Sequence, residues 1–241
     1  MKIILFCVRI YRLTKGDTKM EIYAAIFDVD GTLVDSLGFW DYLWKCLGER
    51  HLNGNQFIPD ADIAMSMRTM SLDGGVRMLY ARHRLGESEE ALVNEIRLLY
   101  KGYYENEVRL KSGVREFIEF CHGRGIKMCI ASGSTRDLIE MVLEREGLRE
   151  YFSEIFTCPD LGTTKEEPYI YLKALEHLGE DIRYTWVFED SLSAARSAKS
   201  QGFNTVGIFD RLNSTNELLK KYSDVYVDEG KTLLSLCEKI K

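Results

Sequence analysis

Proline, histidine and paired cysteines are scarce in this chain. Its 241 residues include three prolines and four histidines, and no Pro-rich linker, low-complexity run or internal repeat is visible. The histidines show no HxH or HExxH spacing, which argues against a zinc site. The six cysteines include no CxxC pair, which argues against a disulfide framework and favours buried or free thiols in a reducing compartment. We therefore expect a cytoplasmic protein.

Long apolar runs and excess positive charge are also missing. No stretch approaches the ~20 apolar residues of a membrane span. The net charge of -6 argues against a non-specific grip on nucleic acid. Hydrophobic residues make up 45% of the chain and charged residues 29%, which is typical of a soluble globular protein with a sizeable core. We expect no nucleic-acid or membrane partner, and a monomer or dimer.

The first 19 residues differ from the rest of the chain. An apolar run from Ile3 to Val8 is followed by several basic residues. It lacks the longer apolar region and the small-residue cleavage site of a signal peptide. Met20 stands directly before the first predicted strand, so translation could begin there. We interpret residues 1–19 as an N-terminal extension outside the catalytic part.

The segment from residue 22 to residue 36 carries the most specific signal. The apolar run from Ile22 to Phe27 predicts a buried strand. It ends in two carboxylates, Asp28 and Asp30, which would emerge in the ligand crevice of an α/β sheet. Two acids in a dry crevice need a cation or a proton between them, and Mg²⁺ suits oxygen ligands. One carboxylate could then attack a phosphorus while the other moves protons.

The next part of the chain has a helical pattern. Apolar residues repeat at three- and four-residue spacing between residues 37 and 104, and no stretch there resembles a strand. The acidic run at 87–90 predicts the start of one of these helices. We expect a helical insert whose Met and aromatic stripes form its own core: Trp40, Trp44, Met65, Met67 and Met70.

From residue 111 onward strands and helices alternate. The predicted strands are Ile126–Ala131, Ile155–Thr157, Thr185–Phe188, Thr205–Phe209 and Val225–Val227. The predicted helices are Val114–Cys121, Leu138–Leu143, Ile170–Leu178 and Ala194–Ala198. The alternation predicts an α/β fold, with a Rossmann-like parallel sheet and helices on both of its faces.

Three further elements stand where phosphoryl transfer would need them. Ser132 follows a strand, where a hydroxyl and the first amides of the next helix can hold a phosphate oxygen, although an ordinary capped turn also explains it. Lys165 offers a cation opposite Asp28. Glu189 and Asp190 end the fourth strand, and adjacent acids at a buried strand end favour a metal there. Asp190 could also cap the following helix, and this role is compatible with metal binding.

Together these elements resemble motifs I to IV of the haloacid dehalogenase superfamily, in its phosphatase and phosphomutase branch. In order, the motifs are Asp28-x-Asp30-Gly31-Thr32, Ser132, Lys165 and Glu189-Asp190-Ser191. The insert matches the position of the small helical cap of β-phosphoglucomutase-like and phosphoglycolate-phosphatase-like members. The resemblance implies a core of residues 20–35 and 111–241 and a cap of residues 36–110.

The resemblance also implies roles for these residues. Asp28 would be the nucleophile that forms an aspartyl-phosphate, and Asp30 the general acid and then the base. Mg²⁺ would be held by Asp28, Asp190 and the backbone carbonyl of Asp30, with Glu189 as a ligand or a neighbour of the ligands. The residues that would bind the phosphoryl group are Thr32, Ser132, Gly133 and Lys165.

The chain departs from the family pattern in two places. After Lys165, members often carry Pro-x-Pro-Asp, whereas this chain has an acidic Glu166-Glu167-Pro168-Tyr169. Where mutases of the family have a histidine, this chain has Trp40. The mutases also hold the sugar phosphate with an arginine and a lysine from the cap, and the candidates here are Arg68, Arg77 and Arg82.

Four functions stay open at this point. The first is a Mg²⁺-dependent phosphatase of small phosphorylated metabolites, and the second is a sugar phosphomutase with the same aspartyl-phosphate chemistry. A haloacid dehalogenase needs no metal and lacks the second aspartate, so Asp30 argues against it. A non-catalytic binding protein on the same fold is the alternative from a different class.

Overall fold

The computed structural model describes residues 19–241, apart from the side chain of Thr69. The extension predicted for residues 1–19 lies outside this range, except for Lys19. Met20 is fully buried, and its backbone N–H donates to the carbonyl of Lys239 at 2.7 Å. The start of the described chain is therefore joined to its C-terminal segment.

A six-stranded sheet forms the centre of the molecule. Its strands are β1 (Ala24–Phe27), β2 (Lys127–Ser132), β3 (Ile155–Thr157), β4 (Thr185–Glu189), β5 (Asn204–Ile208) and β6 (Val225–Val227). They are all parallel, in the order β3-β2-β1-β4-β5-β6. Phe27 lies opposite Ile130 and Phe188, so β1, β2 and β4 end at the same edge. Each predicted strand is present, within two residues of its expected bounds.

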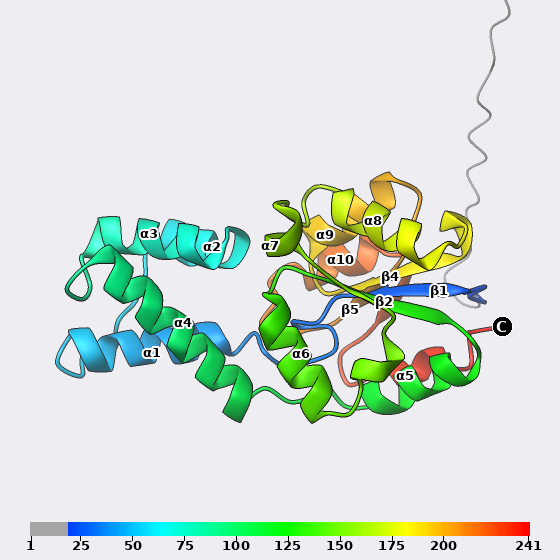
Figure 1. Ribbon diagram of the computed structural model, residues 1–241, viewed down its shortest axis with the longest axis horizontal. Helices are drawn as coiled ribbons and strands as arrows, with labels where there is room; N and C mark the ends of the chain where they lie inside the picture. The colour runs from blue at the N-terminus through cyan, green and yellow to red at the C-terminus, as the bar shows by residue number, and fades with distance from the viewer. Residues whose placement is uncertain (1–18) are drawn as a thin grey trace, which may run out of the picture.

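Helices cover both faces of this sheet, as predicted (Figure 1). One face packs against α5 (Val114–Gly123) and α6 (Arg136–Arg145), the other against α8 (Tyr169–Leu178) and α9 (Leu192–Ser200). The shorter helices of this part are α7 (Cys158–Leu161), α10 (Asn216–Tyr222), η1 (Arg149–Tyr151), η2 (Ile182–Tyr184) and η3 (Leu233–Leu236). Because both faces are covered, the central strand is apolar throughout: all four residues of β1 are buried.

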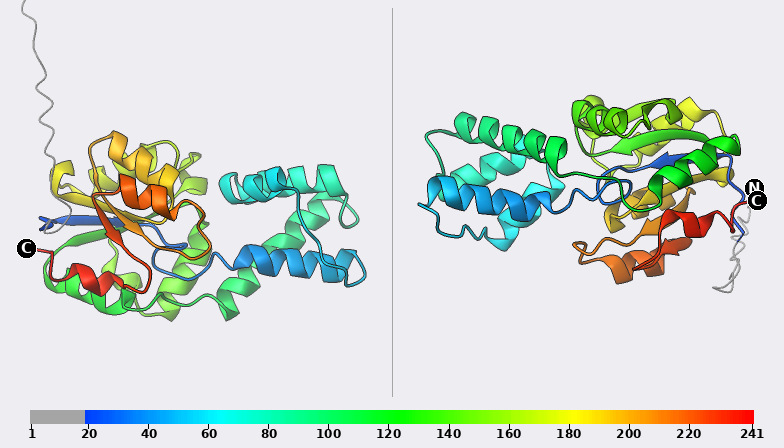
Figure 2. Two further views of the ribbon diagram at one scale, coloured as in Figure 1. Left: turned by 180° about the vertical axis from the view of Figure 1, so that it is seen from behind. Right: turned by 90° about the horizontal axis from the view of Figure 1, so that it is seen from below.

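Four helices inserted after β1 form a separate helical unit. They are α1 (Phe39–His51), α2 (Ala61–Thr69), α3 (Leu72–His83) and α4 (Glu89–Asn106). Their apolar faces make their own hydrophobic cluster, and the unit extends away from one end of the sheet (Figure 2). Ser71 and Ser88 cap α3 and α4 with their side chains. Met67 is buried as expected, but Met65 and Met70 are exposed, so the predicted stripe is only partly core.

The two linkers of the helical unit run together where they meet the sheet. The N–H of Asp35 donates to the carbonyl of Arg109, and the N–H of Lys111 donates to that of Leu33, both at 2.9 Å. These backbone bonds fix the base of both linkers beside the loop that follows β1. The insertion therefore begins and ends at the edge where the acids of the sequence motif emerge.

None of the helices in residues 19–241 is both long and apolar enough to cross a bilayer. The five cysteines in the described part of the chain are free thiols, and four of them are buried.

Candidate active site

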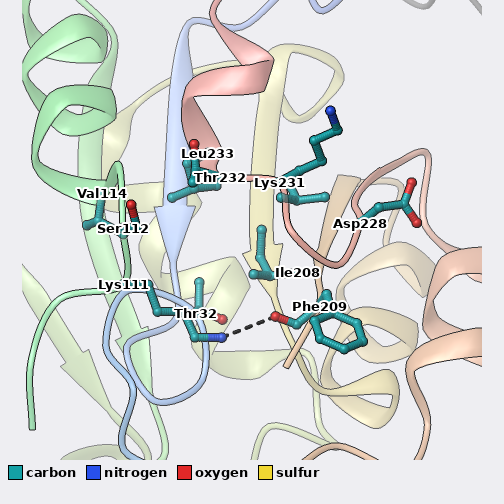
Figure 3. A pocket seen from close by; sticks show the side chains of 11 residues that line it. Thr32, Lys111, Ser112, Val114, Ile208, Phe209, Asp228, Lys231, Thr232 and Leu233 are labelled. Atoms are coloured by element: carbon teal, nitrogen blue, oxygen red, sulfur yellow. Dashed lines mark hydrogen bonds between the residues drawn. The ribbon is translucent and has the colours of Figure 1, made fainter. Parts of the chain in front are cut away.

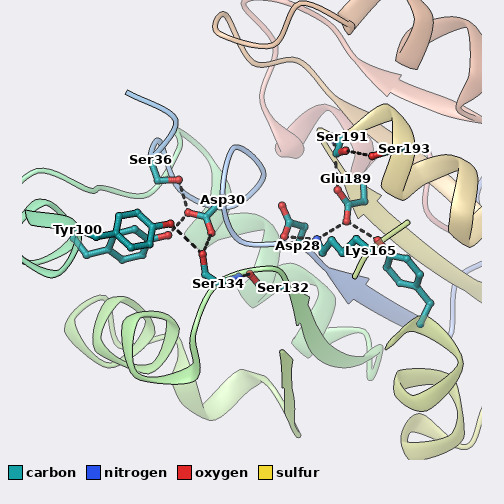
Figure 4. A network of polar contacts seen from close by, with 12 residues as sticks. Asp28, Asp30, Ser36, Tyr100, Ser132, Ser134, Lys165, Glu189, Ser191 and Ser193 are labelled. Atoms are coloured by element: carbon teal, nitrogen blue, oxygen red, sulfur yellow. Dashed lines mark hydrogen bonds and ion pairs between the residues drawn. The ribbon is translucent and has the colours of Figure 1, made fainter. Parts of the chain in front are cut away.

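Asp28 lies directly after β1 and is paired with Lys165. The Lys165 ammonium donates to Oδ1 of Asp28 and to Oε1 of Glu189 at 2.5 Å. Asp28 is 6% exposed and Glu189 is fully buried. Three charged groups from three separate segments thus meet at the carboxyl edge of the sheet (Figure 4), where ligands bind in open α/β folds.

Glu189 is held by more than the lysine. The hydroxyl of Tyr171, on α8, donates to Oε1 of Glu189 at 2.7 Å. The N–H of Ser191 donates to Oε2 of the same carboxylate at 3.4 Å. Because both oxygens accept from protein groups, Glu189 orients Lys165 toward Asp28.

Asp28, Glu189 and Asp190 form an acidic cluster that fits a divalent cation. One carboxylate oxygen from each lies within 4.8 Å of the others, and all three side chains are buried. Three hard oxygen ligands in a dry site suit Mg²⁺. The pKa of Asp190 rises to about 7, chiefly because of burial and then because of the charge of Glu189, against Lys111 and Lys165. This repulsion is what a bound cation would relieve.

Burial and nearby charges also shift the pKa values of Asp28 and Lys165. Burial raises the pKa of Asp28 well above its usual range; Lys165 opposes this rise and Glu189 adds to it. Burial alone would lower the pKa of the Lys165 ammonium, but Asp28 and Glu189 outweigh it and raise that pKa. Lys165 therefore stays protonated, as a group that neutralises a phosphoryl must.

Gly31 brings the loop after β1 close to Asp190. Its φ is +73°, and a Cβ at this position would lie 2.6 Å from Oδ2 of Asp190. A glycine is required both by the left-handed backbone and by this close approach. The glycine of the first sequence motif thus has a direct structural reason.

Asp30 points away from Asp28, into a group of hydroxyls (Figure 4). Its Oδ1 accepts from Ser36 at 2.5 Å and from Tyr104. Its Oδ2 accepts from Ser134 at 2.5 Å, and the Tyr100 hydroxyl lies 3.2 Å from that of Ser134. The donors come from the first linker, from the end of α4 and from the loop after β2. Both oxygens are thus occupied in this arrangement.

Ser132 is the last residue of β2 and is fully buried. Its hydroxyl accepts from the N–H of Ser134 at 3.1 Å and so closes a local turn, whereas α6 begins after Thr135 without a side-chain cap. Gly133 is exposed beside it. The register of β2 against β1 places this turn next to Asp28; its role in binding a phosphoryl group stays a prediction.

Thr32 is placed differently from the other predicted phosphoryl ligands. It is 1% exposed, and its hydroxyl has no hydrogen-bond partner within residues 19–241. It lines a cavity of about 90 Å³ together with Lys111 and Ile208 (Figure 3). Its role in substrate binding stays a prediction.

The acidic loop after Lys165 does not compete for the lysine. Glu166 and Glu167 are both exposed, and Glu167 accepts from the Thr163 hydroxyl at 3.1 Å. Of residues 165–167, Lys165 alone turns inward to the carboxylates of the site. The acidic residues that follow Lys165 therefore do not draw its ammonium away from Asp28 and Glu189.

The three candidate cap arginines have different partners. Arg77 pairs with Glu89, and Arg82 pairs with Asp60 and with Asp62. The Arg68 guanidinium, near the end of α2, lies 5.9 Å from the centre of the Trp40 ring. Arg77 and Arg82 thus form ion pairs with acids of the helical unit itself. Arg68 instead lies over the ring of Trp40, the residue at the position of the mutase histidine.

Comparisons with known proteins identify the family of the chain. Residues 22–202 match the family described as haloacid dehalogenase-like hydrolase, and the chain belongs to that family. Hexitol phosphatase B of Escherichia coli K12 is 29% identical over 194 residues, which are 78% of this chain and 84% of the relative. A phosphorylated carbohydrates phosphatase of Thermotoga maritima is 28% identical over 201 residues, 82% of this chain and 90% of the relative.

Solved structures share the fold. A Thermotoga maritima protein described as a candidate β-phosphoglucomutase superimposes with a TM-score of 0.74 at 26% identity, covering 90% of this chain and 99% of that one. CbbY of Rhodobacter sphaeroides gives 0.69 at 20% identity, covering 86% and 94%. The predicted family, the α/β fold and the assignment as a phosphoric monoester hydrolase are thereby confirmed.

Proposed function

We propose that this protein is a Mg²⁺-dependent phosphatase of small phosphorylated sugars or polyols that works through an aspartyl-phosphate on Asp28. The observation that carries the proposal is the buried pair of Asp28 with Lys165, backed by Glu189. A carboxylate held beside a fixed cation at the crevice edge can attack a phosphorus while the cation offsets the charge that develops.

In the first step an oxygen of Asp28 attacks the phosphorus, and the bond from phosphorus to the ester oxygen breaks. The leaving oxygen takes a proton from Asp30, which must first give up one of its hydroxyl contacts. In the second step Asp30 takes a proton from water as the water oxygen attacks the phosphorus. The Asp28–phosphorus bond breaks, and inorganic phosphate leaves.

Asp28, Asp190 and the backbone carbonyl of Asp30 would hold Mg²⁺, with Glu189 beside them as a further ligand or as a neighbour. When bound, the cation would offset the negative charge of the phosphoryl group and of the three crowded acids. Ser132, Gly133 and Lys165 would bind the phosphoryl oxygens. The fit of three buried carboxylates supports this assignment.

The helical unit is proposed to act as a cap, comprising residues 36–110 over a core of residues 20–35 and 111–241. The separate hydrophobic cluster of the helical unit supports this division, and Tyr104 and Val108, near its end, pack into the core cluster instead. Trp40 and Arg68 would meet the non-reacting part of the substrate, because an aromatic face and a cation suit a hydroxylated carbon chain. The names of the two phosphatase relatives support phosphorylated carbohydrates as the class. A cytoplasmic location and a monomeric or dimeric state stay predictions.

A panel of sugar and polyol phosphates assayed with Mg²⁺ tests the proposal. Release of inorganic phosphate by the wild type, and its loss on addition of EDTA, are expected. Full activity in EDTA would contradict the metal requirement. Binding of Mg²⁺ without turnover on any member would favour a non-catalytic binding protein.

A sugar phosphomutase remains the second candidate, and one assay separates it from the phosphatase. A mutase must keep water from the aspartyl-phosphate while its intermediate reorients. Trp40, an apolar residue where mutases have a histidine, favours hydrolysis. With β-glucose 1-phosphate and a trace of the bisphosphate, we expect free phosphate to accumulate. Faster formation of glucose 6-phosphate would show that the protein is a mutase.

A further inference from the structure

Lys111 stands where the second linker of the helical unit re-enters the core. Its side chain is 20% exposed and turns inward beneath the loop that follows β1. Its ammonium donates to the carbonyl of Gly31 and to the carbonyl of Phe209 at 3.2 Å. It also pairs with Oδ2 of Asp210 at 2.7 Å. Figure 3 shows the contact with Phe209.

These acceptors belong to two different loops of the site. Gly31 lies in the loop after β1, three residues beyond Asp28. Phe209 and Asp210 lie in the loop after β5, and Asp210 is 3% exposed. One ammonium therefore joins the linker base to both loops.

The second loop reaches Asp190 directly. Asn213 lies in the same loop, and its side-chain amide donates to the backbone carbonyl of Asp190 at 2.5 Å. Oδ1 of Asp210 accepts from the N–H of Leu212 at 2.9 Å, which keeps this loop folded back. Lys111 is thus connected to Asp28 through one loop and to Asp190 through the other.

The three contacts of the Lys111 ammonium use all of the hydrogen bonds that it can donate. An ammonium has three protons to donate, and three acceptors from the protein surround this one. Lys165, in contrast, contacts carboxylates of the acidic cluster itself. Lys111 therefore links the loop after β1 to the loop after β5, whereas Lys165 is the lysine placed to contact a phosphoryl group.

We propose that Lys111 is a positioning residue that holds the loops of Asp28 and Asp190 at the spacing that binds Mg²⁺. This inference rests on the proposed function, because it concerns the same metal site. Groups that orient metal ligands without touching the metal typically change affinity by about 10- to 100-fold when removed. Lys111 also ties this spacing to the point where the helical unit is attached.

Whether Mg²⁺ binds more weakly or more tightly after removal of the Lys111 ammonium distinguishes a positioning role from a purely electrostatic one. Removing a cation near a metal site would tighten Mg²⁺ binding by Coulomb's law alone. Loss of the tie between the loops would weaken it. Lys111→Met, which keeps the apolar stem and removes the ammonium, therefore gives opposite results under the two explanations.

Calorimetric titration of the full-length protein with Mg²⁺ alone, without substrate, is the test. We expect Lys111→Met to weaken Mg²⁺ binding about tenfold or more. The matched control is Lys199→Met, because Lys199 also bridges a carbonyl, that of Tyr222, and a carboxylate, that of Asp224, away from the site. The control should lose a similar amount of thermal stability and keep wild-type Mg²⁺ affinity.

Mg²⁺ binding by folded Lys111→Met as tight as, or tighter than, that of the wild type overturns the inference. If Lys111→Met does not fold, Lys111→Arg decides, because it keeps the charge and changes the geometry. Weaker Mg²⁺ binding by Lys111→Arg supports the inference, and wild-type binding overturns it. Because no turnover is needed, absence of phosphatase activity would reject the proposed function alone.

Discussion

The hydroxyl of Tyr104 donates a hydrogen bond to the carboxylate of Asp30 across 74 residues of sequence. Tyr104 is fully buried in the last part of α4. Arg145 donates to the Tyr104 backbone carbonyl at 2.8 Å and so fixes the tyrosine to α6. The residue proposed to move protons is therefore oriented by a side chain from the inserted helices.

Tyr104→Phe should slow turnover of alkyl phosphates by about tenfold or more, since a hydrogen bond to a charged group contributes about 1.5–3 kcal/mol. The phenyl ring keeps the packing, so only the orientation of Asp30 changes. An aryl phosphate, whose leaving group needs little protonation, should be affected less. The measurement is kcat and KM for both substrates.

Tyr103→Phe is the control for this variant. Tyr103 is the preceding residue of α4 and packs against the rings of Phe39 and Tyr42. It should keep wild-type rates on both substrates. Equal slowing of alkyl and aryl phosphates by Tyr104→Phe would show that the hydroxyl has no part in orienting the proton donor.

Gly31→Ala should reduce both Mg²⁺ affinity and activity. The new Cβ would lie 2.6 Å from Oδ2 of Asp190, so the aspartate or the loop must move. The left-handed backbone adds a strain of about 1–2 kcal/mol. Calorimetry with Mg²⁺ and thermal unfolding check the two effects separately.

Gly147→Ala provides the comparison for strain alone. Its φ is +60°, and no described atom lies within 4 Å of a Cβ at that position. It should lose stability but bind Mg²⁺ as the wild type does. The same Mg²⁺ affinity in both alanine variants would contradict the close approach of Gly31 to Asp190.

The stability of the metal-free protein should fall as pH rises toward about 7. The pKa of Asp190 is raised to about 7 in the folded protein, mainly by burial. Between the ordinary aspartate value and about 7 the folded state binds more protons than the unfolded state. The free energy of unfolding therefore decreases with rising pH over this range.

Thermal unfolding in EDTA at about pH 5.5 and at about pH 8 measures this loss. Asp190→Asn should reduce the difference between the two pH values, and Mg²⁺ should restore wild-type stability most at the higher pH. An identical pH dependence for wild type and Asp190→Asn would be inconsistent with the raised pKa.

Much of this architecture could be predicted from local pattern. The apolar run before Asp28 and the strands ending at Ser132 and Glu189 are where periodicity placed them, and their parallel pairing brings those ends together. The position of Lys165 followed from its place in the motif order. Local apolar patterning is informative here because the central strands β1 and β4 are buried on both faces.

Contacts between distant segments could not be predicted in this way. Nothing in the helical pattern around Tyr104 or Tyr171 distinguishes a core tyrosine from one that donates to a carboxylate of the candidate site. The tie made by Lys111 depends on how the second linker enters the core. Ser36 follows the first motif closely in the sequence. Its spacing from Asp30 was the one sequence feature that pointed to the cluster of hydroxyls around that carboxylate.

The most direct measurement of the central claim is trapping of the phosphoryl group on Asp28. The wild type is quenched in acid during turnover with Mg²⁺ and its best phosphoester, and the peptides are analysed by mass spectrometry. We expect a hydroxylamine-labile phosphoryl group on the peptide that contains Asp28. Asp28→Asn should fold, carry no such group and lose activity by far more than the tenfold that about 1.4 kcal/mol represents. Folded Asp28→Asn with more than about a tenth of wild-type activity, a barrier change under about 1.4 kcal/mol, would contradict the assignment of Asp28 as the nucleophile.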